Sequence, residues 1–130
     1  MGRFKNVLLV EDDPITILVC DRIIKMNSFA ANVKSCENGK VALDYLKEAT
    51  SEVDGETPEI IFLDINMPVM NGWDFLEEFE KIKNTLSTVP RIFILSSTVD
   101  PEDYNKAKSY SLVEDFISKP LSKESLDNIR

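Results

Sequence analysis

The stretch EIIFLDINMPVMNG, residues 59–72, decides the fold, because a run of apolar residues ends there in an acid and a turn. Four consecutive apolar residues precede Asp64, and a continuous run of this kind is typical of a strand covered on both faces. An isolated carboxylate is costly to bury, so Asp64 needs a partner unless it only caps the turn. The stretch therefore predicts a buried strand over residues 59–64 that carries an acid to the edge of a sheet.

The same alternation of an apolar run and a helical pattern continues on both sides of this stretch. Strands are predicted over residues 6–10, 31–36, 59–64, 91–95 and 115–117, and helices over residues 14–26, 39–49, 73–84, 101–110 and from Ser122 onward. Parallel strands need crossover connections, and these are right-handed. Five such alternations predict an α/β fold, (βα)5, in which helices cover both faces of a doubly wound five-stranded parallel sheet.

Helical spacing is clearest in the first two predicted helices. Five residues of the first helix recur at the spacing of one helical face. Four residues of the second helix are expected to face inward. These are Ile15, Leu18, Val19, Arg22 and Ile23 in the first helix, and Val41, Ala42, Tyr45 and Leu46 in the second. Residues 50–58 are mostly polar and contain Gly and Pro, so they are predicted to form a solvated loop.

The composition limits the possible functions. A length of 130 residues predicts one domain, residues 1–130, and no apolar run is long enough to span a membrane. The net charge of −8, from 15 basic and 23 acidic residues, argues against direct binding of nucleic acid. Histidine is absent, which excludes histidine-based catalysis and histidine-ligated zinc. Cys20 and Cys36 are interpreted as small core residues of a reducing cytoplasm, since no secretory signal is visible.

Acids crowd the end of the first predicted strand. Glu11, Asp12 and Asp13 follow one another there, and like charges this close raise one another's pKa unless a cation lies among them. Asp13 precedes Pro14 and suits a helix N-cap, and the helix dipole favours acids at this end. This explains Glu11 and Asp12 less well, because they lie at the sheet edge. If the first and third strands are neighbours, Asp64 faces Glu11 and Asp12. Such an oxygen-only set suits Mg²⁺ or Mn²⁺, although helix capping stays open as an alternative.

Two further strand ends carry polar residues of a different kind. The fourth strand runs into Ser96-Ser97-Thr98 and the fifth into Lys119-Pro120. Hydroxyls can donate to an anion and a lysine can neutralise one, whereas ordinary loop polarity is the simpler interpretation of each alone. In a doubly wound sheet, ligands bind beyond the carboxyl ends of the strands. The fold would therefore bring acids, hydroxyl and lysine together at one edge.

With these residues in order, the chain resembles the receiver domain of two-component response regulators, of the CheY-like single-domain type. The resemblance rests on Val10-Glu11-Asp12-Asp13, on Asp64-Ile65-Asn66-Met67-Pro68-Val69-Met70-Asn71-Gly72, on Leu95-Ser96-Ser97 and on Lys119-Pro120. It covers essentially the whole chain. It implies a flavodoxin-like strand order 2-1-3-4-5 and no output domain.

The resemblance also implies a role for each site residue. Asp64 would be the phosphoacceptor, with Mg²⁺ (or Mn²⁺) held by Asp64, by Asp12, by Glu11 through water and by the backbone carbonyl of Asn66. Ser96 and Lys119 would contact the phosphoryl oxygens, and Phe116, three residues before Lys119, would be the switch aromatic. Asn66 and Thr98 lie where the family tunes the lifetime of the phosphate, and the bond before Pro120 is cis in the family.

The function implied is a phosphorylation-dependent signalling switch in the cytoplasm. A sensor histidine kinase or a histidine phosphotransfer protein would donate the phosphoryl group, and the receiver would catalyse its own phosphorylation and dephosphorylation without a separate catalytic domain. The signal would leave by contact with a downstream protein or by onward phosphorelay. No direct contact with nucleic acid or membrane is expected.

Three other functions are weighed against this one. A phosphatase or phosphotransferase with an aspartate nucleophile typically has a second acid two residues later, where this chain has Asn66. A pseudo-receiver would bind proteins without taking a phosphate, but the acids, Ser96 and Lys119 are intact. A flavodoxin-like cofactor binder would need a Gly-rich loop after the first strand, and none follows Val10.

Overall fold

The computed structural model describes residues 3–51, 57–65, 67, 69–85, 89–97 and 100–129, with the backbone alone at residues 49–51. Strands and helices alternate along it five times, as predicted. The elements are β1 (Phe4–Val10), α1 (Pro14–Met26), β2 (Ala30–Cys36), α2 (Gly39–Ser51), β3 (Ile60–Asp64), α3 (Gly72–Ile82), η1 (Lys83–Thr85, a 3-10 turn), β4 (Arg91–Ser96), α4 (Pro101–Lys108), β5 (Val113–Ser118) and α5 (Lys123–Asp127).

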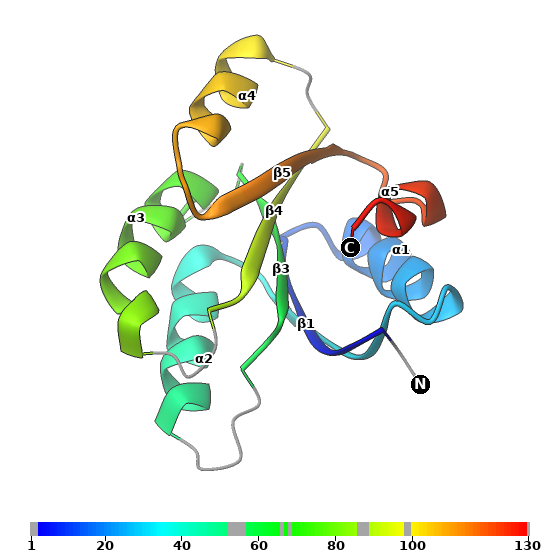
Figure 1. Ribbon diagram of the computed structural model, residues 1–130, viewed down its shortest axis with the longest axis horizontal. Coiled ribbons are helices and arrows are strands. Elements are labelled where there is room, and N and C mark those ends of the chain that lie inside the picture. The colour runs from blue at the N-terminus through cyan, green and yellow to red at the C-terminus, as the bar shows by residue number, and fades with distance from the viewer. Residues whose placement is uncertain are drawn as a thin grey trace.

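All five strands are parallel and lie in the order β2-β1-β3-β4-β5. Figure 1 shows α1 and α5 against one face of this sheet and α2 and α3 against the other. The central strand β3 is buried along its whole length, which accounts for its continuous apolar run. The predicted fold class and strand order are confirmed. The carboxyl ends of β1, β3, β4 and β5 therefore meet at one edge.

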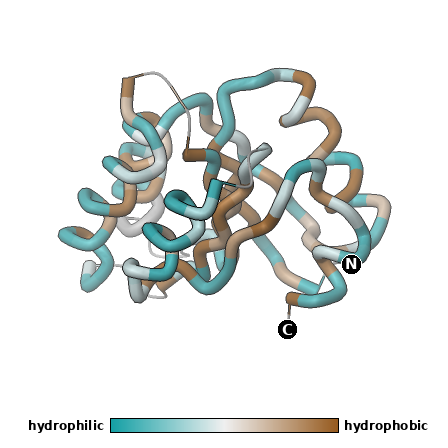
Figure 2. The backbone as a smooth tube through the Cα atoms, turned by 90° about the horizontal axis from the view of Figure 1, so that it is seen from above, coloured by the Kyte–Doolittle hydropathy of each residue, from teal (hydrophilic) through white to brown (hydrophobic). Residues whose placement is uncertain are grey.

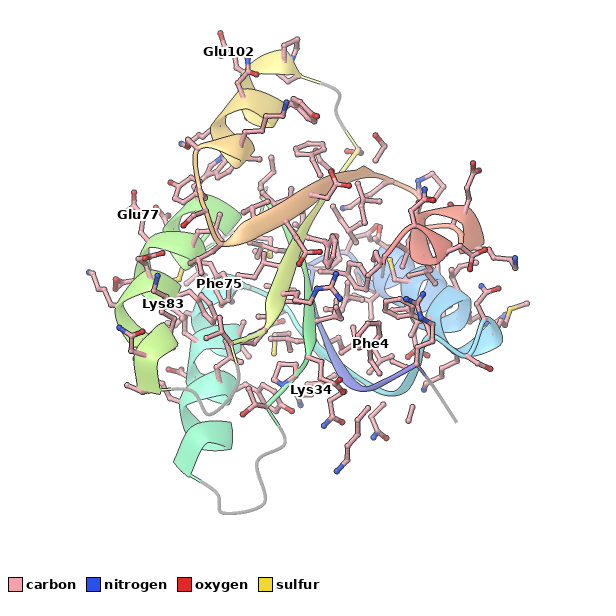
Figure 3. The ribbon with its side chains drawn as sticks, in the orientation of Figure 1. Phe4, Lys34, Phe75, Glu77, Lys83 and Glu102 are labelled. Carbon is pink, nitrogen blue, oxygen red and sulfur yellow. The ribbon has the colours of Figure 1, made fainter. Side chains whose placement is uncertain are left out.

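Apolar side chains fill both interfaces between the sheet and its helices. One core lies under α2 and α3, and the other under α1 and α5. Figure 2 shows hydrophobic residues gathered along the strands and hydrophilic ones on the outer turns of helices. In α3, Phe75 points toward the sheet while Glu77 points outward (Figure 3). This separation is what an amphipathic helix on a buried sheet requires.

Several boundaries differ from the prediction. The third helix begins one residue earlier, at Gly72, because Asn71 caps it by accepting a hydrogen bond from the backbone N–H of Asp74. It ends at Ile82 and tightens into the 3-10 turn η1 instead of continuing to residue 84. The last strand is longer than expected, and α2 runs into the predicted loop as far as Ser51. Residues 52–56 of that loop lie outside the described residues.

Two parts of the predicted helical pattern face solvent instead of the core. Ile15, Leu18 and Val19 of α1 are 72%, 53% and 39% exposed, whereas Cys20 and Ile24 are buried. The helix carries apolar residues on both sides, so spacing alone cannot identify the side that meets the sheet. Val41 of α2 is also exposed, which corrects its predicted inward position.

Both cysteines are buried and form no disulfide, as the sequence predicted. Burial raises the pKa of each thiol to about 11, so neither is a ready nucleophile at neutral pH. No helix within the described ranges is long and apolar enough to cross a membrane.

The two ends of the chain are held together by Arg3. Its guanidinium donates hydrogen bonds to the backbone carbonyls of Leu126 (3.1 Å) and Ile129. The same group lies over the rings of Phe4 and Phe29, 5.5 and 5.4 Å from their centroids. Arg3 thereby fixes the last residues of the chain against the start of β1.

Candidate functional site

Three carboxylates converge at the carboxyl edge of the sheet. Glu11 and Asp12 follow β1, and Asp64 is the last residue of the neighbouring strand β3. One ligand oxygen from each lies within 4.8 Å of the others. Glu11 and Asp64 are buried and Asp12 is exposed. The adjacency of β1 and β3, which the sequence left as a condition, brings these acids together.

Lys119 places a cation against this acidic group. Its Nζ lies 2.6 Å from Glu11 Oε2 and 3.7 Å from Asp64 Oδ1. The backbone N–H of Lys119 donates to the carbonyl of Ser96 at 2.8 Å, which fixes the start of the β5–α5 connection against the end of β4. The Lys119–Pro120 bond is cis. Lys119 thus meets acids from two other strand ends, of which Glu11 lies 108 residues earlier in the chain.

The charges of the site do not balance. Burial raises the pKa of Glu11, and the charge of Asp64 adds to this, although the hydrogen bond from Lys119 opposes it. Burial alone would lower the pKa of Lys119, but the hydrogen bond to Glu11 and the charges of Asp64 and Glu11 raise it overall. Three carboxylates thus face one ammonium group. The excess negative charge makes the site suitable for a divalent cation.

Asp13 is separate from this group. Its side chain accepts hydrogen bonds from the backbone N–H groups of Ile15 (3.4 Å) and Thr16 (3.3 Å) and from the Thr16 hydroxyl (2.7 Å). The bond from the Thr16 hydroxyl is the largest cause of the lowered pKa of Asp13. Asp13 is therefore the N-cap of α1, as its position before Pro14 predicted.

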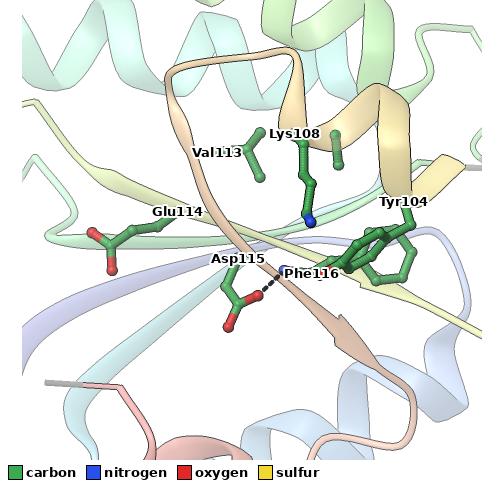
Figure 4. Close-up of a pocket in the computed structure, with 7 residues that line it drawn as sticks. Tyr104, Lys108, Val113, Glu114, Asp115 and Phe116 are labelled. Atoms are coloured by element: carbon green, nitrogen blue, oxygen red, sulfur yellow. Dashed lines mark hydrogen bonds between the residues drawn. The ribbon is translucent and has the colours of Figure 1, made fainter.

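Ser96 and Phe116 lie beyond the acids, toward α4. Ser96 ends β4 and is 1% exposed. Phe116 is half-buried, and its ring meets that of Tyr104 edge-on, with centroids 5.8 Å apart. Figure 4 shows both rings at a small pocket of about 70 Å³ between α4 and β5, with Lys108 beside them. The ammonium group of Lys108 lies 4.5 Å from the centroid of the Tyr104 ring.

Two predicted site residues, Asn66 and Thr98, lie outside the described residues.

Comparison with known proteins identifies the family. A family model described as the response regulator receiver domain matches residues 7–129. The chain belongs to this family. A two-component response regulator from Cytophaga hutchinsonii is similar in structure, with a TM-score of 0.85 and 34% sequence identity, over 96% of this chain and 92% of that one. A two-component response regulator of Oryza sativa subsp. japonica is 36% identical over 93% of this chain and 87% of its own length.

Receiver domains also occur inside larger proteins. Hybrid signal transduction histidine kinase L of Dictyostelium discoideum is 27% identical over 95% of this chain, but the match covers only 7% of that kinase. Receiver domains accept phosphoryl groups from histidine kinases and bind Mg²⁺ at an acidic pocket. Membership therefore supports phosphorylation-dependent signalling by this chain, and the acids at its sheet edge match the expected pocket. No separate catalytic domain is present in the part of the chain that the structure describes.

The connection between β3 and α3 shows a feature of this receiver domain that the sequence did not reveal. Val69, in this connection, has a φ of 66° and a side chain that is 79% exposed. A positive φ is a genuine outlier for a β-branched residue, and such strain persists only where the surroundings enforce it. The sequence does not indicate this positive φ, because valine has no preference for a left-handed backbone.

Replacing Val69 with glycine is expected to stabilise the receiver domain by about 1 kcal/mol. Relief of the strain is worth about 1–3 kcal/mol, and the greater backbone entropy of glycine in the unfolded chain offsets about 0.5–1 kcal/mol of it. Urea unfolding at pH 7 measures the change. Val41→Gly is the matched control, since Val41 is an exposed valine in ordinary helix, and it should lose stability. A less stable Val69→Gly chain would contradict the strain.

Proposed function

We propose that this receiver domain is a switch that accepts a phosphoryl group on Asp64 in a Mg²⁺-dependent reaction. The donor is a sensor histidine kinase or a histidine phosphotransfer protein. The observation that carries the proposal is the position of Asp64: a buried carboxylate at the end of the central strand, 3.7 Å from the ammonium group of Lys119 and beside two further acids.

The residues present fit a hard divalent cation. Asp12 is exposed and can offer an oxygen directly, together with Asp64. The resemblance to receiver domains adds the backbone carbonyl of Asn66, which lies outside the described residues. Both oxygens of Glu11 already accept hydrogen bonds, from Lys119 and from the backbone N–H of Asp13, which suits a contact through water. When bound, Mg²⁺ supplies positive charge that offsets the negative charge of the phosphoryl oxygens.

The chain's own residues supply the remaining chemistry. An oxygen of the Asp64 carboxylate attacks phosphorus and the new O–P bond forms, while the P–N bond to the donor histidine breaks and its electron pair stays on the leaving imidazole. Lys119 places its ammonium group where negative charge gathers on the phosphoryl oxygens, and Ser96 can donate its hydroxyl proton to one of them. Burial of Asp64 excludes bulk water from the reacting oxygen.

Phosphorylation then shifts the conformation of the region around α4. The new group adds about 1.5–2 negative charges, and Ser96 moves toward it. The space that Ser96 vacates admits Phe116, which now lies half-buried against Tyr104. This shifts the population between two states that differ at the surface formed by α4, β5 and α5. Asn66 and Thr98 tune how long the phosphoryl group remains.

In this proposal residues 1–130 act as one receiver domain in the cytoplasm. The signal leaves by contact with another protein or by transfer of the phosphoryl group to a further histidine. The receiver catalyses its own phosphorylation and dephosphorylation, because Asp64, Lys119 and Ser96, with the metal, act on the phosphoryl group without a separate catalytic domain.

Incubation with acetyl phosphate and Mg²⁺ tests the proposal without a kinase. The chain is expected to gain the mass of one phosphoryl group, stable to acid and labile to base, as an acyl phosphate should be. Intact-mass spectrometry measures it, and chelation of Mg²⁺ should slow the gain strongly. If the mass stays unchanged with acetyl phosphate and with a histidine kinase as donor, the chain is a pseudo-receiver that acts by protein binding alone.

A further inference from the structure

We propose that Gly39, at the start of α2, is a positioning residue for the site at Asp64. It holds Met70 in the β3–α3 connection in place, although it lies at the start of α2 and is not itself one of the three acids. The inference rests on the proposed function, since it concerns the same site.

The two ends of the β3–α3 connection are held together directly after β3. The backbone N–H of Gly72 donates to the carbonyl of Ile65 at 3.2 Å. A Cβ at Gly72 would lie 2.7 Å from the carbonyl oxygen of Asp64 and 2.7 Å from the Cα of Ile65, closer than real side chains approach. Only glycine lets α3 begin this close to the residue that is to be phosphorylated.

Met70, two residues before α3 begins, is anchored on the start of α2. The backbone N–H of Gly39 donates to the carbonyl of Met70 at 3.1 Å. A Cβ at Gly39 would lie 2.9 Å from the Cγ of Met70, and 3.0 Å from both its Sδ and its carbonyl oxygen. Met70 thus packs directly on the backbone of Gly39, with no space for a side chain between them.

The start of α2 is itself held in place. Asn38 is buried, and its side chain accepts a hydrogen bond from the backbone N–H of Val41 at 3.0 Å. Two residues earlier, the carbonyl of Cys36 accepts a hydrogen bond from the backbone N–H of Glu11 at 2.9 Å. The segment that carries Gly39 is therefore tied to the acidic end of β1. Through Gly39, the same segment sets where Met70 lies.

Strain at Val69 indicates that these two anchors determine the backbone conformation at Val69. Val69 precedes Met70, and its exposed side chain does not hold the backbone in the left-handed region by packing. Strained residues persist where their surroundings over-determine them. The hydrogen bonds at Gly39 and Gly72 supply that constraint from the two sides.

Glycine is required at position 39 for space, not for backbone freedom. Its φ lies outside the left-handed region, so alanine could adopt the same backbone. At the start of a helix, alanine would ordinarily stabilise the chain. An alanine that impairs the site must therefore do so through the contact with Met70.

The Gly39→Ala variant tests this with the full chain. Its rate of phosphorylation by acetyl phosphate is expected to fall about tenfold, because a misplacement of about 1 Å near reacting groups can cost up to about a hundredfold. Its affinity for Mg²⁺, measured by calorimetry, should fall in parallel. Circular dichroism and thermal unfolding show that the variant is folded under the conditions of both measurements.

Rescue by a second substitution separates positioning from a general loss of structure. Met70→Ala removes the Cγ and Sδ atoms that the new methyl group would meet. The double variant Gly39→Ala/Met70→Ala should recover most of the rate and of the Mg²⁺ affinity relative to Gly39→Ala. Lys40→Ala is the matched control, because it alters the next, exposed residue of the same helix and should leave both quantities unchanged.

Two results would contradict the positioning role of Gly39. One is a Gly39→Ala variant with native rate and native Mg²⁺ affinity. The other is a loss that Met70→Ala does not relieve, because the expected loss arises from the contact of the new methyl group with the Met70 side chain. Failure of the proposed function looks different, because the native chain would then take no phosphoryl group. The positioning role of Gly39 would in that case be tested by Mg²⁺ affinity alone. A native chain that binds no Mg²⁺ would contradict that role.

Discussion

Replacing Asp64 with asparagine is expected to abolish phosphorylation while leaving the fold intact. Asparagine has nearly the shape of aspartate, but its amide cannot attack phosphorus as a carboxylate does. The native chain should gain one phosphoryl group with acetyl phosphate and Mg²⁺, and the variant none, by intact-mass spectrometry. The expected effect is the largest of any single substitution here, because it removes the attacking carboxylate itself.

Stability provides a second measurement on the same variant. The charge of Asp64 contributes to the raised pKa of Glu11, so removal of that charge relieves repulsion in the site. Asp64→Asn should therefore unfold at a temperature no lower than the native chain. Asp13→Asn is the matched control: asparagine caps a helix as well as aspartate does, and this chain should be phosphorylated normally. Equal modification of Asp64→Asn and native chains would rule out Asp64 as the phosphoacceptor.

Replacing Lys119 with methionine is expected to destabilise the fold by about 3 kcal/mol at pH 7. The substitution leaves Glu11 and Asp64 buried without their cation, and an uncompensated buried charge costs about 3–5 kcal/mol. The lower value is expected because the Lys119 side chain is 15% exposed. Urea unfolding measures the loss. Lys123→Met is the control, since its exposed pair with Asp127 should contribute less than about 1 kcal/mol.

The loss should depend on pH in a definite direction. The pKa of Glu11 is already raised in the folded chain, and without Lys119 it rises further. A carboxyl with a raised folded pKa binds protons more tightly when folded, so stability falls as pH rises above its unfolded value of 4.5. The raised pKa of Lys119 stabilises the native chain throughout this pH range, because the whole range lies far below 10.5, the unfolded pKa of lysine. The deficit of Lys119→Met should thus shrink between pH 7 and pH 4.5. A deficit that is constant over this range would contradict the buried-charge explanation.

The sequence predicted most of the fold because burial on both faces leaves a plain signal. The run before Asp64 is apolar throughout since β3 is covered on both sides, and the acids after β1 and β3 follow from strand order. Five of the predicted site residues lie at or just after strand ends, where parallel topology must bring them together, namely Glu11, Asp12, Asp64, Ser96 and Lys119. Their positions could therefore be anticipated without knowledge of any distance.

The features that escaped prediction depend on contacts between segments distant in sequence. The outward position of Ile15 and Leu18 depends on which side of α1 meets the sheet, and both sides are apolar. The approach of Gly39 to Met70 joins residues 31 positions apart, and a glycine at a helix start is too common to indicate it. Likewise, the ion pair between Lys119 and Glu11 follows only once β5 and β1 have been placed in one sheet.

The contact of Arg3 with Leu126 and Ile129 has a practical consequence for labelling. β1 runs from Phe4 toward the acids, and α5 returns against β5, so both ends of the described chain lie at the sheet edge opposite Asp64 (Figure 1). A fluorescent protein or surface anchor attached at either end would project away from the phosphoryl donor. A pair of dyes for fluorescence energy transfer, one attached at each end, would report unfolding as a rise in the distance between them. Neither dye would obstruct the reaction.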